Sequence, residues 1–205
     1  MKTFRKKTSI FLFLPGLLLA VLSCSRSPQS MTTEITLSDN WVLAPDSLLK
    51  TDGTLISQSD FSSAAWIRTK VPSTVLGALA DAGVYADLYF GKNLESVPRQ
   101  QFTRPWWYRR EFELTDSTSY PVNRLRFEGI NYYANVWING RLVASADTIK
   151  GAFRTFDIDI SPFVHNGKNV VAVQVFPPKP GDYYMGFVDW TPRPPDENMG
   201  LFRPV

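Results

Sequence analysis

The chain of 205 residues contains a single cysteine and a single histidine. Cys24 has no partner for an intrachain disulfide, so the sequence predicts no disulfide framework. The same count excludes a zinc site built from cysteine and histidine. His165 lies in a predicted turn. There, a histidine that is hydrogen-bonded or exposed to solvent is favoured over a catalytic general base that activates a serine or cysteine nucleophile. No glycine-rich phosphate loop occurs either. The sequence therefore predicts neither a metal nor a cofactor.

The acidic side chains offer little for catalysis. Cleavage of a glycosidic bond normally needs two carboxyl groups across that bond, one protonated and one ionised. The candidates are Glu95, Glu111, Glu113, Glu128 and the adjacent pair Asp196 and Glu197. Each is better explained as a solvated or structural charge, with Glu111, Glu113 and Glu128 at outward strand positions. For Asp157 and Asp159, a solvated strand face is favoured over a calcium site. The sequence therefore predicts no catalytic residue.

Residues 1–23 have the pattern of a secretory signal peptide. Four positive side chains are followed by an apolar run over 10–22, which is too short and too sharply ended to span a membrane. Small residues then precede Cys24, and this spacing resembles a bacterial lipobox, where the cysteine thiol is lipidated. The alternative is an ordinary secreted protein with an incidental cysteine. The four positive residues are Lys2, Arg5, Lys6 and Lys7.

The lipobox predicts an exported bacterial lipoprotein in the periplasm or at the outer membrane surface. Acyl chains on Cys24 would hold the domain at a membrane without a protein span, and residues 24–36 would serve as a polar tether. The net charge is +3. Since four positive and no negative side chains lie in residues 1–23, the rest of the chain carries −1. The charge therefore gives no argument for a nucleic-acid partner.

Residues 37–205 predict an all-β domain. In the stretch 156–160, Phe156, Ile158 and Ile160 alternate with two aspartates, so one face of the strand is apolar. Sheets with one apolar face must cover each other, which predicts a β-sandwich of jelly-roll, galactose-binding-domain-like type. Strands or strand openings are expected at 38–43, 66–71, 105–114, 124–128, 136–138, 142–143, 156–160 and 171–175.

Two local sequence patterns predict a turn and a helix between these strands. Asn139-Gly140 predicts a type I′ hairpin turn, because both central residues need a positive φ. One short helix is expected over 72–83, with Ser73 or Thr74 as its cap, Gly83 after its end, and an apolar face. That face comprises Val75, Leu76, Leu79 and Ala82.

The stretch 182–199 is rich in proline, aromatic and acidic residues and predicts a long ordered loop, of a kind that is often functional. Asp189 and Trp190 offer a hydroxyl acceptor and a stacking surface for a sugar ring. The alternative, left open by the residues alone, is that Trp190 plugs the end of the sandwich and Asp189 caps a turn. The other prominent aromatics predict core or sheet-face positions. These are Trp106, Trp107, Tyr132, Tyr133 and Trp137.

Several motifs, in this order and spacing, resemble the N-terminal β-domain of glycoside hydrolase family 2. They are VPSTVL at 71–76, PWWYRREF at 105–112, GINYYANVWING at 129–140 and DWTPRPPDENMGLFRPV at 189–205. The first is most similar to the exo-β-glucosaminidase and β-mannosidase branch. The resemblance implies retaining hydrolysis of a terminal β-mannoside or β-glucosaminide by the parent enzyme.

The resemblance also implies site residues and a partner domain. Asp189 would accept sugar hydroxyls, Trp190 would form a wall of the sugar subsite, and Asn93 matches by position an asparagine of related galactosidases. The family's catalytic glutamates lie on a (β/α)₈ barrel of about 250 residues, for which this sequence has no room. We therefore expect a non-catalytic N-terminal fragment that is inactive alone and whose partners are the barrel and a carbohydrate. The alternatives are a free-standing carbohydrate-binding lipoprotein and a structural module without a ligand.

Overall fold

The computed structural model describes residues 32–115, 120, 122–184, 186 and 190–205. The chain divides into two units, Met1–Ile35 and Thr36–Val205, and the second contains every helix and strand described below. The predicted signal peptide, Cys24 and most of the predicted tether lie outside the described residues. Within the described residues, no helix is long and apolar enough to cross a membrane.

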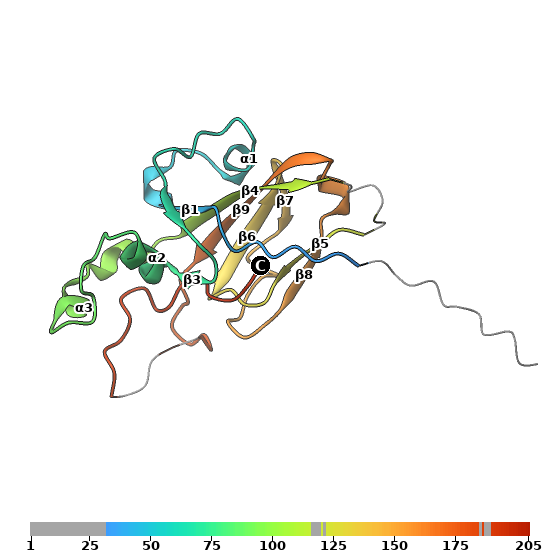
Figure 1. The fold of residues 1–205 in the computed structure, drawn as a ribbon. Coiled ribbons are helices and arrows are strands. Elements are labelled where there is room, and N and C mark those ends of the chain that lie inside the picture. The colour runs from blue at the N-terminus through green and yellow to red at the C-terminus, as the bar shows by residue number, and fades with distance from the viewer. Residues whose placement is uncertain (1–31, 116–119, 121, 185, 187–189) are drawn as a thin grey trace, which may run out of the picture. The chain divides into compact units, whose positions relative to one another are not determined.

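A six-stranded antiparallel sheet forms the larger layer of the domain (Figure 1). Its centre is the pairing of β4 with β9, which runs along the whole of β4 from Trp106 opposite Val175 to Leu114 opposite Gly167. In sheet order, the strands are β2 (Ile67–Thr69), β1 (Trp41–Pro45), β4 (Trp106–Leu114), β9 (Gly167–Phe176), β6 (Tyr133–Ile138) and β7 (Arg141–Ala144).

Two short strand pairs form the second layer. β5 (Arg124–Phe127) pairs with β8 (Phe156–Asp159), and β3 (Ser73–Thr74) pairs with β10 (Gly200–Leu201). The main core joins side chains of both layers, among them the fully buried Trp41, Tyr108, Phe127, Val173 and Leu201. This sandwich-like arrangement is the predicted fold class, and the predicted strands are present with shifts of a few residues at their ends.

The outer face of the large sheet is also covered at its centre. There α1 (Gly53–Ile56) lies over a second apolar cluster that includes Trp107, Trp137 and Ala172. A Cβ atom on Gly53 would come within 2.1 Å of the Trp137 ring, so only glycine lets the helix approach this closely. Burial on both faces explains why Ala172 is fully buried, as are its neighbours Val171 and Val173, which point to the opposite face of the strand.

The predicted helix is α2 (Val75–Asp81). As expected, the Thr74 hydroxyl accepts a hydrogen bond of 3.1 Å from Gly77 N, and Gly83 follows the helix with a φ of 75°. Ala82 is exposed, and Ala78 takes its place on the buried face. The structure has more helical turns than the single helix predicted, because segments of three or four residues show no helical periodicity. These are α1, α3 (Asn93–Ser96), η1 (Asp46–Leu48), η2 (Arg99–Phe102) and η3 (Ser161–Phe163).

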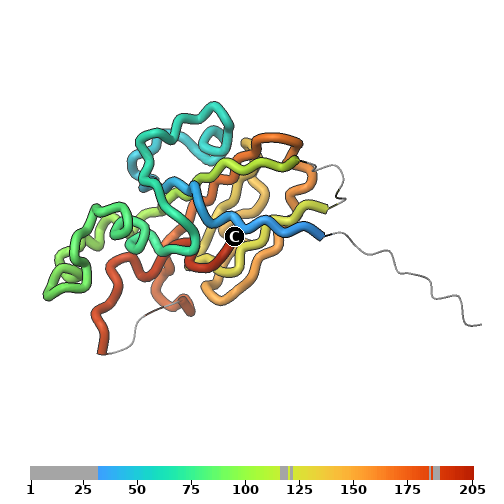
Figure 2. The backbone as a smooth tube through the Cα atoms, viewed as in Figure 1, coloured from blue at the N-terminus to red at the C-terminus, as the bar shows by residue number. Residues whose placement is uncertain are grey.

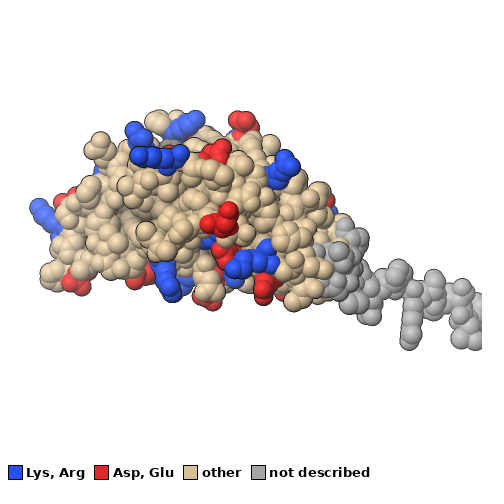
Figure 3. Space-filling model, turned by 90° about the horizontal axis from the view of Figure 1, so that it is seen from above, with Lys and Arg blue, Asp and Glu red and all other residues tan. Residues whose placement is uncertain are grey.

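The Asn139-Gly140 hairpin is confirmed. Asn139 has a φ of 47° and Gly140 a φ of 83°, which are the positive values that a type I′ turn requires. The Asn139 side chain also joins neighbouring strands and loops, because its Nδ2 donates to Phe163 O and its Oδ1 accepts from Val170 N. On the face of the molecule in Figure 3, basic and acidic side chains are interspersed over a mostly uncharged surface.

Candidate functional site

Residues 182–199, here called the C-terminal loop, lie between β9, which ends at Phe176, and β10, which begins at Gly200. In Figure 2 this loop, in red, lies beside the green segment that carries α2 and α3. A pocket of about 370 Å³ lies between them. Thr191, Pro192 and Pro194 line it from the loop, and Leu88 and Leu94 line it from the helical segment.

Asp196 anchors the loop to α2. This residue is 1% exposed, and its carboxylate accepts hydrogen bonds from Leu76 N at 2.8 Å and from Asn198 N at 3.0 Å. Burial raises the pKa of the Asp196 carboxyl, although hydrogen bonds from Leu76, Asn198 and Thr74 act to lower it. A buried carboxylate with these partners holds the loop in place and satisfies a free amide of the first helical turn.

Asn131 anchors the same loop from the other side. This residue is fully buried, and its Nδ2 donates to the carbonyls of Glu197 and Asn198, both at 2.9 Å. Its backbone exchanges two hydrogen bonds with Gly200. A Cβ atom on Gly200 would lie 2.7 Å from the Tyr108 hydroxyl oxygen, so the chain passes where only glycine fits. Asn131 Oδ1 is buried without a hydrogen-bond partner in the described part of the chain.

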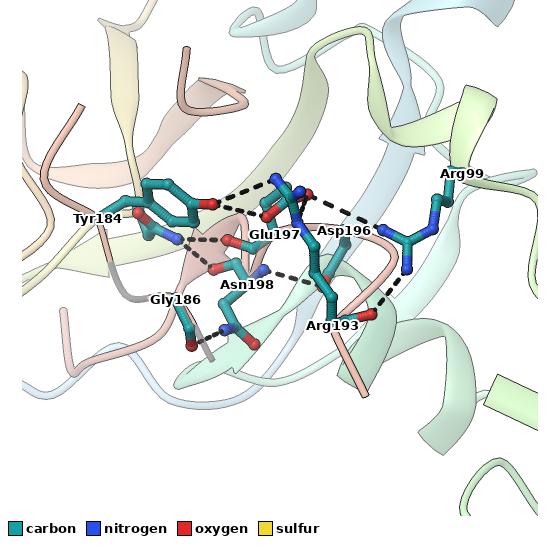
Figure 4. Close-up of polar contacts among 8 residues, drawn as sticks. Arg99, Tyr184, Gly186, Arg193, Asp196, Glu197 and Asn198 are labelled. Atoms are coloured by element: carbon teal, nitrogen blue, oxygen red, sulfur yellow. Dashed lines mark hydrogen bonds and ion pairs between the residues drawn. The ribbon is translucent and has the colours of Figure 1, made fainter. Parts of the chain in front are cut away.

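Glu197 is the centre of a charged cluster on the loop (Figure 4). Arg193 Nε lies 2.7 Å from Glu197 Oε1, and the Tyr184 hydroxyl donates to Glu197 Oε2 at 2.9 Å. Arg99, from η2, donates to Arg193 O at 2.9 Å and lies 4.0 Å from the Glu197 carboxylate. The cluster therefore joins two points of the loop to each other and to the helical segment.

The structure describes two of the three residues predicted to bind sugar, Trp190 and Asn93, and places both on the surface. Trp190 is 84% exposed, so it does not plug the end of the sandwich. Asp189 lies outside the described residues. Asn93 begins α3 on the surface, where its Nδ2 donates to Asp87 O at 2.9 Å. Neither Asn93 nor Trp190 lines the pocket, although Leu94 and Thr191 beside them do.

Among the acidic residues set aside as catalysts or calcium ligands, Glu111, Glu197 and Asp157 have ionic partners. Glu111 lies 3.1 Å from Arg109 Nη2 and 3.1 Å from Lys168 Nζ. Although burial acts to raise it, the pKa of Glu111 is lowered, because Lys168 and Arg109 stabilise the ionised form. Asp157 binds Arg126 through a contact of 2.7 Å. Within the described residues, no group of three or more His, Cys, Asp or Glu side chains is placed to hold a metal ion.

The aromatic residues expected in the core or on sheet faces lie where predicted. Trp106, Trp107 and Trp137 are buried, and Tyr132 and Tyr133 are half-buried. What the sequence did not reveal is the role of Asn131, Asp196 and Glu197 as anchors of the C-terminal loop. Asp196 and Leu76 are 120 positions apart, and no local pattern marks a contact of that range.

Comparisons with known proteins agree with the fold and the motifs. The family model described as glycosyl hydrolase 2 galactose-binding domain-like matches residues 54–180. An exo-β-D-glucosaminidase of Amycolatopsis orientalis is 40% identical over 155 residues, which are 75% of this chain and 15% of that protein. An exo-β-D-glucosaminidase of Streptomyces avermitilis is 35% identical over 151 residues, or 73% of this chain and 16% of that protein.

Solved structures lead to the same family. The crystal structure of Amycolatopsis orientalis exo-chitosanase CsxA matches with a TM-score of 0.78 and 36% identity, over 84% of this chain and 20% of that chain. A complex of this enzyme with PNP-β-D-glucosamine matches with a TM-score of 0.77. The chain thus spans about a fifth or less of each of these proteins. It belongs to the galactose-binding-domain-like family of glycosyl hydrolase 2 proteins, as the N-terminal domain of exo-β-glucosaminidase-like enzymes.

Proposed function

We propose that this domain forms one side of the terminal-sugar subsite in an exo-acting family 2 glycosidase. The parent enzyme hydrolyses terminal β-glucosaminides or β-mannosides on a catalytic barrel, and the C-terminal loop reaches toward that barrel with Asp189 and Trp190. Asp189 accepts hydroxyl hydrogen bonds, and Trp190 packs against the apolar face of the sugar ring. Asn93 is a weaker candidate for the same subsite.

The exposure of Trp190 is the observation that carries this proposal. A large aromatic side chain that is 84% exposed gains little from its own fold, because most of its apolar surface stays in water. It lies three positions before Arg193, which is paired with Glu197, in a loop that Asp196 also anchors. An anchored loop with an exposed aromatic side chain fits a role in binding a ligand or another domain.

A chimeric enzyme tests the proposal. Residues 37–205 of this chain replace the matching segment of the Amycolatopsis orientalis exo-β-D-glucosaminidase, and hydrolysis of PNP-β-D-glucosamine is measured. We expect an active chimera in which Trp190→Ala lowers kcat/KM by about ten-fold, the effect of about 1.4 kcal/mol of lost binding. The matched control is Tyr183→Ala, since Tyr183 is 91% exposed on the same loop.

Two outcomes would contradict the proposal. In an active chimera, equal kcat/KM values for Trp190→Ala and Tyr183→Ala would show that Trp190 contributes nothing to the sugar subsite. Turnover by the isolated chain, abolished by replacing one of its own carboxylates, would show that this domain is catalytic. The absence of turnover by the isolated chain alone is expected.

A free-standing carbohydrate-binding lipoprotein is the second candidate, and the exposed Trp190 favours it equally. It predicts that the isolated chain binds oligosaccharides and that Trp190→Ala abolishes this binding. A glycan panel without any binding would exclude it. The third possibility, a structural module without a ligand, depended on burial of both Asp189 and Trp190, and the exposure of Trp190 argues against it.

We also propose that the protein is exported and lipidated at Cys24. The positive start, the apolar run and the small residues before Cys24 support this reading. Expression in a Gram-negative host with radiolabelled palmitate should label the chain, and Cys24→Ser should remove the label. Equal labelling of both forms would contradict lipidation at this cysteine.

A further inference from the structure

A single carboxylate joins two distant points of the C-terminal loop. Glu197 Oε1 lies 2.7 Å from Arg193 Nε, and Glu197 Oε2 accepts from the Tyr184 hydroxyl at 2.9 Å (Figure 4). Tyr184 and Arg193 are nine positions apart, and Arg193 Nη2 also donates to the Tyr184 hydroxyl at 3.4 Å. Trp190 lies between them in the sequence. Glu197 therefore links one residue before Trp190 to one residue after it.

The carboxylate itself is held firmly in place. Glu197 has a φ of 51°, its amide donates to Pro194 O at 3.1 Å, and its carbonyl accepts from the buried Asn131 side chain at 2.9 Å. Its side chain is only 20% exposed. A charge-assisted hydrogen bond in such a partly buried position is stronger than an ion pair in open solvent.

The rest of the cluster links the loop to the body of the domain. Arg99, from η2, donates to Arg193 O at 2.9 Å and adds a second positive charge 4.0 Å from the Glu197 carboxylate. Glu197 also affects the pKa values of Tyr184 and Arg193. The pKa of Tyr184 is raised first by burial and then by its hydrogen bond to Glu197, and the hydrogen bond to Glu197 also raises the pKa of Arg193. Both shifts have the direction that a hydrogen bond to the nearby negative charge of Glu197 produces.

Building on the proposed function, we propose that Glu197 is a positioning residue for Trp190. By holding Tyr184 and Arg193 together, its carboxylate fixes described residues on both sides of Trp190 in the sequence. The affinity of the assembled enzyme for its terminal sugar then depends on Glu197, although this carboxylate does not contact the sugar. Both Glu197 oxygens are engaged within the loop, which separates this role from that of a catalytic carboxylate.

The first experiment measures the position of Trp190 without any sugar. The chain is labelled with 5-fluorotryptophan, and the ¹⁹F resonance of Trp190 is assigned by its loss in Trp190→Phe. In Glu197→Ala we expect this resonance to move by more than its linewidth. The resonances of the buried Trp41, Trp106 and Trp107 should keep their positions, because the sandwich is unchanged.

Three further variants calibrate this result. Tyr184→Phe removes the hydrogen bonds that the Tyr184 hydroxyl makes with Glu197 and Arg193 but keeps the Arg193–Glu197 ion pair, and it should move the Trp190 resonance less than Glu197→Ala. Glu197→Gln keeps the side-chain length but loses the charge, and it should give an intermediate shift. It also serves as the test if Glu197→Ala does not fold. The matched control is Asp157→Asn, because Asp157 contacts Arg126 Nε at the same 2.7 Å but lies on β8. It should leave the Trp190 resonance unchanged.

The second experiment measures the consequence for sugar binding in the chimeric enzyme. Glu197→Ala should raise KM for PNP-β-D-glucosamine by about five-fold, the scale of one lost hydrogen bond or stacking contact. We expect kcat to change by less than about two-fold, because no group that reacts with the sugar is altered. A combined Glu197→Ala, Trp190→Ala enzyme should have the KM of Trp190→Ala alone, since the two residues act through one contact.

The two experiments separate the failure of each proposal. An unmoved Trp190 resonance in both Glu197 variants would overturn the positioning role, whatever the chain binds. A moved resonance with an unchanged KM would keep Glu197 as an anchor of the loop and would contradict the sugar-facing role of Trp190. A loss of kcat with KM unchanged would instead indicate that Glu197 takes part in the reaction.

Discussion

The central strand pair and the C-terminal loop are held by different forces. β4 and β9 pair along nine residues, and apolar side chains are buried on both sides of them, including Trp107 and Val173. The loop owes its position to a few polar groups, chiefly Asp196, Asn131 and Glu197. Stability in the sheet is therefore shared among many contacts, while the position of the loop depends on single hydrogen bonds. Substitutions should unfold the sheet region as a whole but displace the loop locally.

The largest effect is expected in the sheet. Trp107 is 1% exposed, its ring centroid lies 5.1 Å from that of Trp137, and its Nε1 donates to Asp46 at 2.8 Å. Trp107→Ala should lower the free energy of unfolding by about 3–5 kcal/mol, because it leaves a large cavity. Urea denaturation measures this loss. The matched Trp190→Ala should cost less than about 0.5 kcal/mol, and equal losses would break the distinction between the two regions.

A smaller effect is expected at the anchor between loop and helix. Asp196→Asn keeps one acceptor oxygen but turns an NH₂ group toward a backbone amide. It should lower the free energy of unfolding by about 1–2 kcal/mol. Hydrogen exchange should quicken at the Leu76 amide, which donates to Asp196 Oδ2, and stay unchanged at Val173 in β9. Equal acceleration at both amides would show that the loop and the sheet open together.

The same variant gives a pH-dependent prediction. Burial raises the pKa of Asp196 in the folded chain above the ordinary 3.8, so the folded state binds this proton more tightly than the unfolded state. The resulting stability is present below pH 3.8 and is lost as pH rises through the folded-state pKa. The unfolding free energy of the chain minus that of Asp196→Asn should therefore fall with pH over this window. A rise with pH would mean that hydrogen bonding outweighs burial at this carboxyl.

The sheet and the C-terminal loop also differ in how well the sequence predicts them. The alternation of apolar and polar residues predicts the strands, Asn139-Gly140 predicts the hairpin turn, and Thr74 predicts the start of α2. Each of these signals depends only on residues that are neighbours in the sequence. Burial of the sheet on both faces is not predicted, since it depends on α1, which has only four residues.

Nor does the sequence distinguish the adjacent residues Asp196 and Glu197, one of them buried against α2 and the other partly exposed beside Arg193. Their roles follow from contacts with residues far along the chain. The sequence resemblance supplied the candidates Asp189, Trp190 and Asn93. The anchors that hold the loop emerge only from the folded chain.

The smallest effect is expected at the Arg126–Asp157 pair on the β5–β8 sheet. The contact is 2.7 Å long, but the side chains are 60% and 35% exposed, so water screens much of the attraction. Asp157→Asn should change the free energy of unfolding by less than about 0.5 kcal/mol, measured by urea denaturation. A loss as large as that of Asp196→Asn would show that exposure is a poor guide to the strength of ion pairs in this domain.

The most direct test of the central claim is the ratio of kcat/KM for PNP-β-D-glucosamine between the chimeric enzyme and its Trp190→Ala variant. A ratio of about ten, with Tyr183→Ala near one, is the result that a sugar-facing C-terminal loop predicts. A ratio near one for Trp190→Ala, in a chimera that hydrolyses the substrate, would contradict it.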